Sequence, residues 1–180
     1  MTRSQEYDLL VTGSRVLRAG RLRRGWLALR DGAIARAGDG APPRAARRID
    51  AGDDAVGPPL VDTHVHGFGG FDASRCGASS SGDPNNGEEE LRGMARALLA
   101  AGVGAFCPTL YPMEPRRTLD CLRAIARVRD HQRNDEAVVV GAHVEGPFVS
   151  PARPGASTGA GSSPIPTFWS ASSRRGPFRW

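Results

Sequence analysis

Apolar and polar residues alternate in short runs over the first fifty positions of the chain. Alternation with a period of two predicts half-buried β-strands, and here it predicts strands over 7–11, 15–17, 26–30 and 33–35. Gly13-Ser14 and Asp31-Gly32 separate these runs and are expected to be turns, because Asp-Gly between alternating runs is a strong hairpin signal. Residues 1–57 are therefore predicted to form a small β unit, which needs a partner layer to bury both of its faces.

After Gly57 the pattern changes to an alternation of apolar strands and amphipathic helices. We expect a strand over 60–64, a loop over 67–87, a helix over 88–101, a strand over 103–107 that ends at Pro108, a helix over 114–133 and a strand over 137–145. The last strand is apolar throughout, as parallel strands covered on both faces are. Alternation of this kind predicts an α/β fold with a parallel sheet and right-handed crossovers.

Apolar residues recur at helical spacing in both predicted helices. Glu88, Glu89 and Glu90 are expected in the first turn of the first helix, where the helix dipole favours negative charge. The apolar positions are Leu91, Met94, Ala95, Leu98 and Leu99 in the first helix, and Leu119, Leu122, Ile125, Ala126 and Val128 in the second.

The composition is that of a globular protein, with 180 residues of which 39% are hydrophobic and 24% charged. It excludes collagen-like, disulfide-rich and highly charged disordered proteins. No apolar run is long enough to span a membrane and no signal-peptide core follows Met1, so we expect a cytoplasmic protein without a membrane partner. Cys76, Cys107 and Cys121 are odd in number and form no Cys-x-x-Cys pair, which favours a reducing compartment and structural roles.

The formal net charge of +5 does not indicate a nucleic-acid-binding protein. The excess of positive charge lies in residues 1–50 and 157–180, whereas residues 51–156 carry more acidic than basic side chains. No segment combines clustered basic residues with interleaved aromatic ones, so we expect no nucleic-acid partner. Residues 157–180 show neither helical nor strand periodicity and are expected to be an irregular tail.

Two histidines, His64 and His66, follow one another at the end of the first predicted parallel strand. Side chains at i and i+2 of a strand point to the same face, so two imidazoles there can converge on one divalent cation. Two solvated or core-capping histidines are the alternative. The position favours the metal, because ligands in α/β folds gather at the carboxyl ends of parallel strands.

Glu145 is the second candidate and lies at the carboxyl end of the third predicted parallel strand, on the same face as His143. A carboxylate is a hard oxygen donor that suits a divalent metal. An exposed glutamate with a capping role is the alternative. Asp62 and Asp72 are expected to be turn residues or to orient ligands, and Cys107 to be a small buried hydrophobic residue.

Three segments, with Gly155-Ala156 after them, resemble in order and spacing the N-terminal half of the N-acetylglucosamine-6-phosphate deacetylases of the amidohydrolase superfamily. They are residues 59–67 (Pro-Leu-Val-Asp-Thr-His-Val-His-Gly), 106–110 (Phe-Cys-Pro-Thr-Leu) and 143–148 (His-Val-Glu-Gly-Pro-Phe). The His-x-His motif alone indicates only the superfamily, whereas the Glu-Gly-Pro-Phe stretch points to the deacetylases.

The resemblance implies a (β/α)8 TIM-type barrel, of which this chain holds the first three strands, preceded by part of a small β-sandwich. The implied domains are sandwich strands over 1–57, barrel over 58–156 and a tail unlike the family over 157–180. Glu145 matches the family's metal-binding glutamate, and His64 and His66 match the pair that holds a second metal in some members. The implied cofactor is a divalent metal, zinc first, with iron, manganese or cobalt as alternatives.

The implied enzyme is a metal-dependent hydrolase that converts N-acetylglucosamine 6-phosphate to glucosamine 6-phosphate and acetate. Its partner is a phosphorylated amino sugar, and full-length family members are expected to be homo-oligomers. The family's further histidines and catalytic aspartate match no position before residue 156, so no catalytic residue is assigned and the chain is interpreted as truncated. A catalytically inactive amidohydrolase fragment or an interaction module is the alternative, and metal content separates the two.

Overall fold

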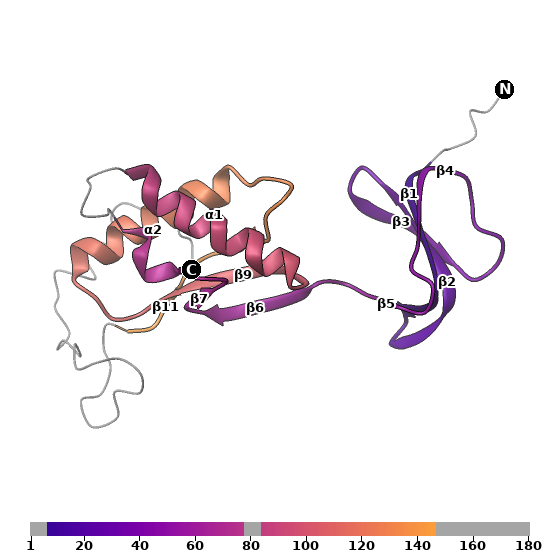
Figure 1. Cartoon of the computed structure of the whole chain (residues 1–180), viewed down its shortest axis with the longest axis horizontal. Helices are drawn as coiled ribbons and strands as arrows, with labels where there is room; N and C mark the ends of the chain where they lie inside the picture. The colour runs from indigo at the N-terminus through magenta and orange to yellow at the C-terminus, as the bar shows by residue number, and fades with distance from the viewer. Residues whose placement is uncertain (1–6, 78–83, 147–180) are drawn as a thin grey trace. The chain divides into compact units, whose positions relative to one another are not determined.

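The computed structural model describes residues 7–77 and 84–146, which belong to two compact units divided between Pro58 and Pro59. The first unit consists of strands and the second is a mixed α/β unit (Figure 1). The part of the chain predicted as a tail, 157–180, lies outside the described residues. Within the described ranges, no helix is long and apolar enough to cross a membrane.

The first unit is a five-stranded sheet in which β1 pairs with three other strands. Its strands are β1 (Tyr7–Arg18), β2 (Arg21–Arg30), β3 (Ala33–Gly38), β4 (Ala45–Asp50) and β5 (Ala55–Val56). The pairs β1–β2 and β2–β3 are antiparallel, and β4 and β5 pair with β1 in parallel. The region is therefore a β unit as predicted, although β4 and β5 are not among the predicted strands.

The two predicted turns of the first unit have different outcomes. The hairpin at Asp31-Gly32 is confirmed, and both residues have the positive φ that a tight two-residue turn requires, 52° and 74°. The turn predicted at Gly13-Ser14 is wrong, because β1 continues through it with a β-bulge between Gly13 and Val16. Small and polar residues suit a bulge as well as a turn, so their composition does not distinguish the two.

The second unit is built on a parallel sheet with β9 (Val103–Leu110) in the middle. Strand β6 (Leu60–Val65) pairs with one edge of β9, and β10 (Val138–Val139) and β11 (His143–Val144) pair with the other. Phe106 of β9 shows this order, because it is partnered by both Asp62 and Val139. The predicted α/β class and the parallel pairing of the three strand regions are confirmed.

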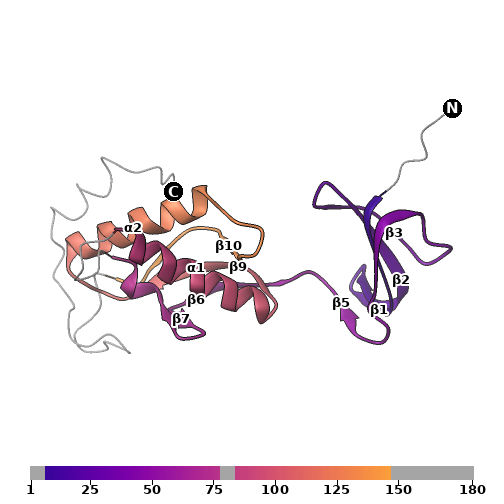
Figure 2. The same cartoon turned by 45° about the horizontal axis from the view of Figure 1, so that its top comes forward.

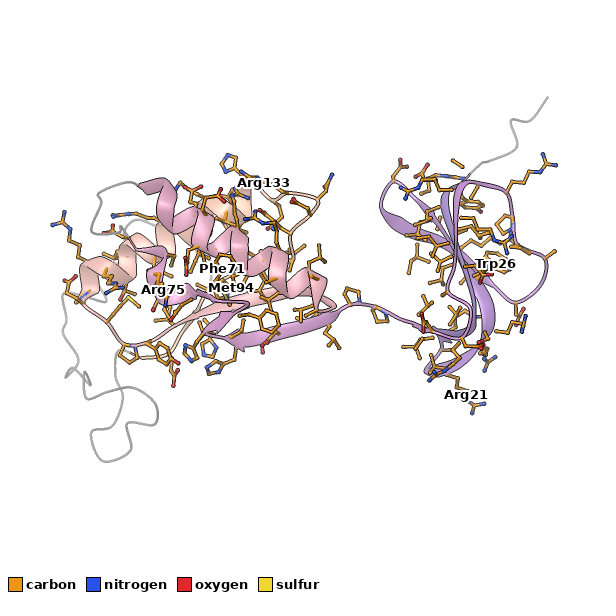
Figure 3. The ribbon with its side chains drawn as sticks, viewed as in Figure 1. Arg21, Trp26, Phe71, Arg75, Met94 and Arg133 are labelled. Atoms are coloured by element: carbon orange, nitrogen blue, oxygen red, sulfur yellow. The ribbon has the colours of Figure 1, made fainter. Side chains whose placement is uncertain are left out.

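Helices α1 (Pro84–Ala100) and α2 (Pro115–Asp130) lie on the same side of β6 and β9 (Figures 1 and 2). Between β6 and α1 the predicted loop contains the antiparallel pair β7 (Gly67–Phe68) and β8 (Phe71–Asp72) and the 3-10 turn η1 (Ala73–Cys76). Figure 3 shows Phe71 and Met94 on the side of α1 that faces the strands. The fully buried large residues of this core are Leu91, Met94, Leu98, Phe106, Leu110, Ile125, Val128 and Val139.

The opposite face of this sheet carries exposed apolar side chains. Val61 of β6 is 64% exposed, and Val138 and Val140 on the other edge are 48% and 58% exposed. Val61 and Val138 are both partnered with Ala105 of β9, so they share one face of the sheet. The described helices therefore cover only one of the two faces.

Helix α1 begins earlier than the sequence predicts. It starts at Pro84, so Glu88, Glu89 and Glu90 lie beyond its first turn and the predicted dipole role is wrong. These carboxylates instead pair with arginines, Glu88 with Arg127 of α2, Glu89 with Arg96 and Glu90 with Arg75. Glu88 and Glu90 thus tie α1 to α2 and to η1, whereas the Glu89–Arg96 pair lies within α1.

Strand β9 does not end at Pro108 as predicted. It continues to Leu110, and proline is tolerated because the β6–β9 register shifts at this point. Pro108 has no backbone N–H and cannot donate a hydrogen bond to a neighbouring strand. Beside it, the N–H of Val65 donates to the side-chain Oγ1 of Thr109 at 2.9 Å. The strand predicted over 137–145 is likewise two short strands, β10 and β11, separated around Gly141, where a strand is weak.

Helix α2 ends at Asp130, short of the predicted Arg133, and Glu114 caps its start by accepting a hydrogen bond from the N–H of Arg117. Ile125 and Val128 are buried as predicted. The other buried positions are Thr118, Cys121 and Ala124, whereas Leu119, Leu122 and Ala126 are half-buried. The buried face of α2 therefore contains more small residues than the sequence predicts, and small residues allow close packing.

Candidate metal centre

His64, His66 and Glu145 come together at the carboxyl ends of the parallel strands. One ligand atom from each lies within 4.8 Å of the others. The Nε2 atom of His66 is 3.1 Å from Oε2 of Glu145 and 3.2 Å from Nε2 of His64, and the last atom is 3.7 Å from the same carboxylate oxygen. The predicted convergence of the three side chains is confirmed.

The local backbone explains why these side chains meet. Strand β6 ends at Val65. The N–H of His64 donates to Oδ1 of Asp62 at 3.0 Å, and this bond holds the backbone at the end of the strand, just before His66. Glu145 follows β11 directly, and its N–H donates to the carbonyl of Leu110 at 3.0 Å. The two histidines therefore come from the end of β6 and the glutamate from the end of β11. Both strands are paired with β9, which lies between them.

His66 is held by two contacts that leave one ring nitrogen directed at the cluster. Its Nδ1 lies 3.2 Å from the carbonyl oxygen of Thr109, and since a carbonyl only accepts, Nδ1 carries the proton. The Tyr111 ring stacks on the imidazole with centroids 3.6 Å apart and planes 6° from parallel. In the neutral ring, Nε2 then presents its lone pair toward Glu145 and His64.

His64 is the most exposed of the three donors, with its side chain 49% exposed against 24% for His66 and 36% for Glu145. Its ring makes an edge contact with the ring of His143, with centroids 4.3 Å apart and an interplanar angle of 67°. The cluster is thus half-open to solvent on the His64 side and closed by Tyr111 on the His66 side.

The donor set fits a divalent transition metal. Two imidazole nitrogens and one carboxylate oxygen are the ligand types that zinc, iron, manganese and cobalt bind. Three protein donors with a partly exposed side is the pattern of a catalytic metal site, where one position is kept for water or substrate. The two Nε2 atoms and the carboxylate oxygen also lie close enough to one another to bind a single shared cation.

The other candidate residues do not join this cluster. Asp62 orients the backbone of His64, and Asp72 accepts from the N–H of Ser74 at 2.8 Å as a turn residue, both as expected. Cys107 is half-buried rather than buried, and desolvation raises the pKa of its thiol. These side chains therefore support the site or lie apart from it.

The remaining two cysteines lie together in the core. Cys76 and Cys121 are both buried, and the hydrogen bond to Cys121, with desolvation, raises the pKa of Cys76. The same bond lowers the pKa of Cys121. Their location in the helix-covered core separates them from the metal ligands.

Thr109 and Tyr111 are not among the predicted site residues, although Thr109 belongs to the 106–110 segment that carries the family resemblance. Thr109 lies at the end of an apolar strand, and Tyr111 follows it by two positions. Only the register of β9 against β6 brings them to His66. The carboxyl-end rule that places His66 would also place these two residues at the same rim once β9 is known to extend beyond Pro108.

No family model matches the chain. Among curated relatives, the N-acetylglucosamine-6-phosphate deacetylase of Homo sapiens is 31% identical over 156 residues, which are 82% of this chain and 35% of the relative. That of Bacillus subtilis is 30% identical over 142 residues, 75% of this chain and 33% of the relative. The chain thus spans about a third of the length of these relatives.

Solved structures agree with the sequence comparison. The N-acetyl-D-glucosamine-6-phosphate deacetylase of Mycobacterium smegmatis, determined in complex with N-acetyl-D-glucosamine-6-phosphate, matches with a TM-score of 0.69 and 28% identity. The match covers 92% of this chain and 40% of that one. The enzyme of Pasteurella multocida has a TM-score of 0.72 at 14% identity over 91% of this chain and 41% of its own, which shows a shared fold.

Proposed function

We propose that this chain, which is N-acetylglucosamine-6-phosphate deacetylase-like in sequence and fold, carries part of the metal centre of a hydrolase that cleaves the acetamide of a phosphorylated amino sugar. The products would be acetate and glucosamine 6-phosphate. The observation that carries the proposal is the convergence of His64, His66 and Glu145 at the strand ends.

In this proposal His64, His66 and Glu145 hold a divalent metal, with zinc as the first candidate. When bound, the metal supplies a Lewis acid that polarises the acetamide carbonyl and lowers the pKa of a bound water. Glu145 contributes the negative charge that holds the cation, and Thr109 keeps the proton of His66 on Nδ1 so that Nε2 is available.

An interaction module without catalytic activity is the second candidate, and the exposed apolar face of the second unit favours it. Val61, Val138 and Val140 are exposed on the sheet face opposite the helices, and exposed apolar patches often mark interaction sites. A module of this kind has no need of a metal. Metal binding therefore distinguishes the two functions.

The first test is zinc binding by the purified chain, measured by calorimetry. We expect Glu145→Gln to weaken zinc binding at least tenfold, because a neutral amide is a weaker donor than a carboxylate. For the activity of a longer version of the chain, His66→Asn is expected to have a milder effect than Glu145→Gln if one metal is sufficient. Glu89→Gln, an exposed carboxylate on α1, is the matched control and should bind zinc as the unchanged chain does. Equal binding by the Glu145 and Glu89 variants would remove Glu145 from the ligand set.

The second test is acetate release from N-acetylglucosamine 6-phosphate by residues 1–180, with zinc added. Only three protein donors gather in the described residues, and the chain spans about a third of its relatives. We therefore expect turnover far below the range of about 1–1,000 per second that is typical of enzymes. Turnover within that range would show that residues 1–180 contain a complete active site.

A further inference from the structure

His143 lies beside the three donor residues without being one of them. It is the first residue of β11, where it is partnered with Thr109 of β9. Its ring nitrogen Nδ1 lies 3.2 Å from the carbonyl oxygen of Thr63 on β6. Because a carbonyl only accepts, Nδ1 is the donor. This bond joins β11 to β6, two strands that both pair with β9 and not with one another.

The same ring also contacts the side chain of His64. The His64 and His143 centroids are 4.3 Å apart with the planes 67° from parallel, an edge-to-face contact. Thr63, whose carbonyl accepts from His143, is the residue immediately before His64. His143 therefore touches both the backbone that carries His64 and the imidazole itself.

His64 needs such support more than His66 does. His66 has its Nδ1 bonded to Thr109 and its ring stacked on Tyr111. Within the described part of the chain, Nδ1 of His64 makes no corresponding bond, and the side chain is half exposed. On the open side of the cluster, the contact with His143 therefore does for His64 what stacking on Tyr111 does for His66.

We propose that His143 is a positioning residue that holds His64 in the orientation required for metal binding. The inference rests on the proposed metal centre. Groups that orient a metal ligand typically contribute 10- to 100-fold to metal affinity. His143 would do so in two separable ways, through the bond to Thr63 and through the ring contact with His64.

Three variants test the proposal, with Co²⁺ as the probe because its visible absorption reports ligand geometry. We expect His143→Ala, which removes both contacts, to weaken Co²⁺ binding about 10- to 100-fold and to alter the absorption spectrum. His143→Phe keeps a ring against His64 without the donor and should lie between His143→Ala and the unchanged chain. His131→Ala is the matched control, since His131 contacts its own helix at the carbonyl of Arg127 and should leave Co²⁺ affinity within about twofold.

A second readout needs no metal. Long-range ¹H–¹⁵N spectra of the imidazoles should show His143 protonated at Nδ1 and should show averaged or broadened His64 signals in His143→Ala, with the signals of His131 unchanged. Circular dichroism melts establish that each variant is folded. Unchanged Co²⁺ affinity and unchanged His64 signals in both His143 variants would overturn the positioning role. If the unchanged chain binds no Co²⁺, the proposed metal centre fails, and the His64 signals alone decide whether His143 positions the ring.

Discussion

The two units of the chain are stabilised in different ways. The first has a small buried cluster of Leu10, Trp26 and Ala28, and most of its order comes from backbone pairing along β1 and β2. In the second unit, two helices bury a large apolar cluster against a short parallel sheet. Burial of apolar area is the larger contribution to stability, so the second unit is expected to depend on its core and the first on its turns and ladders.

The difference matters for the candidate metal centre. The side chains that hold and support it lie in or just after β6, β9 and β11, and β9 is anchored by Phe106 and Leu110 in the helix-covered core. A site built on strand ends above a packed core keeps its geometry better than one built on loops alone. A substitution that weakens this core should therefore also disturb the positions of the metal ligands. A substitution in the first unit should leave the contacts among the ligands unchanged.

The largest expected effect comes from Phe106→Ala. Phe106 is fully buried in the middle of β9, and replacing a buried phenylalanine by alanine costs about 3–5 kcal/mol of unfolding free energy. Hydrogen exchange followed by mass spectrometry should show faster exchange throughout β6, β9 and α1, with β1 and β2 unchanged. Equal loosening of both units would show that they do not unfold independently.

A smaller effect in the same unit is expected from Glu136→Gln. The Glu136 side chain is fully buried and pairs with Arg92, itself 5% exposed, at 2.8 Å. Removing one partner of a buried ion pair leaves the other charge without compensation, which costs about 3 kcal/mol. The measurement is urea unfolding followed by circular dichroism.

Asp120→Asn is the control for this change, because Asp120 pairs at 2.8 Å with Arg123 of the same helix, α2, and the Arg123 side chain is 65% exposed. Exposed ion pairs contribute little, so its expected cost is under about 1 kcal/mol. Similar losses in the two variants would mean that the Arg92–Glu136 pair is no more important to the unit than a surface contact.

Local patterns predict the parts of this molecule that depend on neighbouring residues in the sequence. The hairpin at Asp31-Gly32 and the shared face of His64 and His66 follow from spacing alone. Tyr111 and the Thr63–His143 bond depend on strand register, which is set by pairing between distant segments. Strand β4 is missed for a related reason, because its order comes from pairing with β1 and its sequence lacks apolar alternation.

The smallest expected effect tests the first unit. Gly32 has a φ of 74° in the hairpin between β2 and β3, and a Cβ atom there would meet nothing within 4 Å. Gly32→Ala is therefore disfavoured by backbone conformation and not by crowding, and should cost about 1 kcal/mol. Gly40→Ala is the matched control, since Gly40 also has open space and lies outside the positive-φ region. Hydrogen exchange should show faster opening of β2 and β3 in Gly32→Ala only, while zinc affinity stays unchanged in both variants. A loss of zinc affinity in Gly32→Ala would show that the first unit supports the metal centre after all.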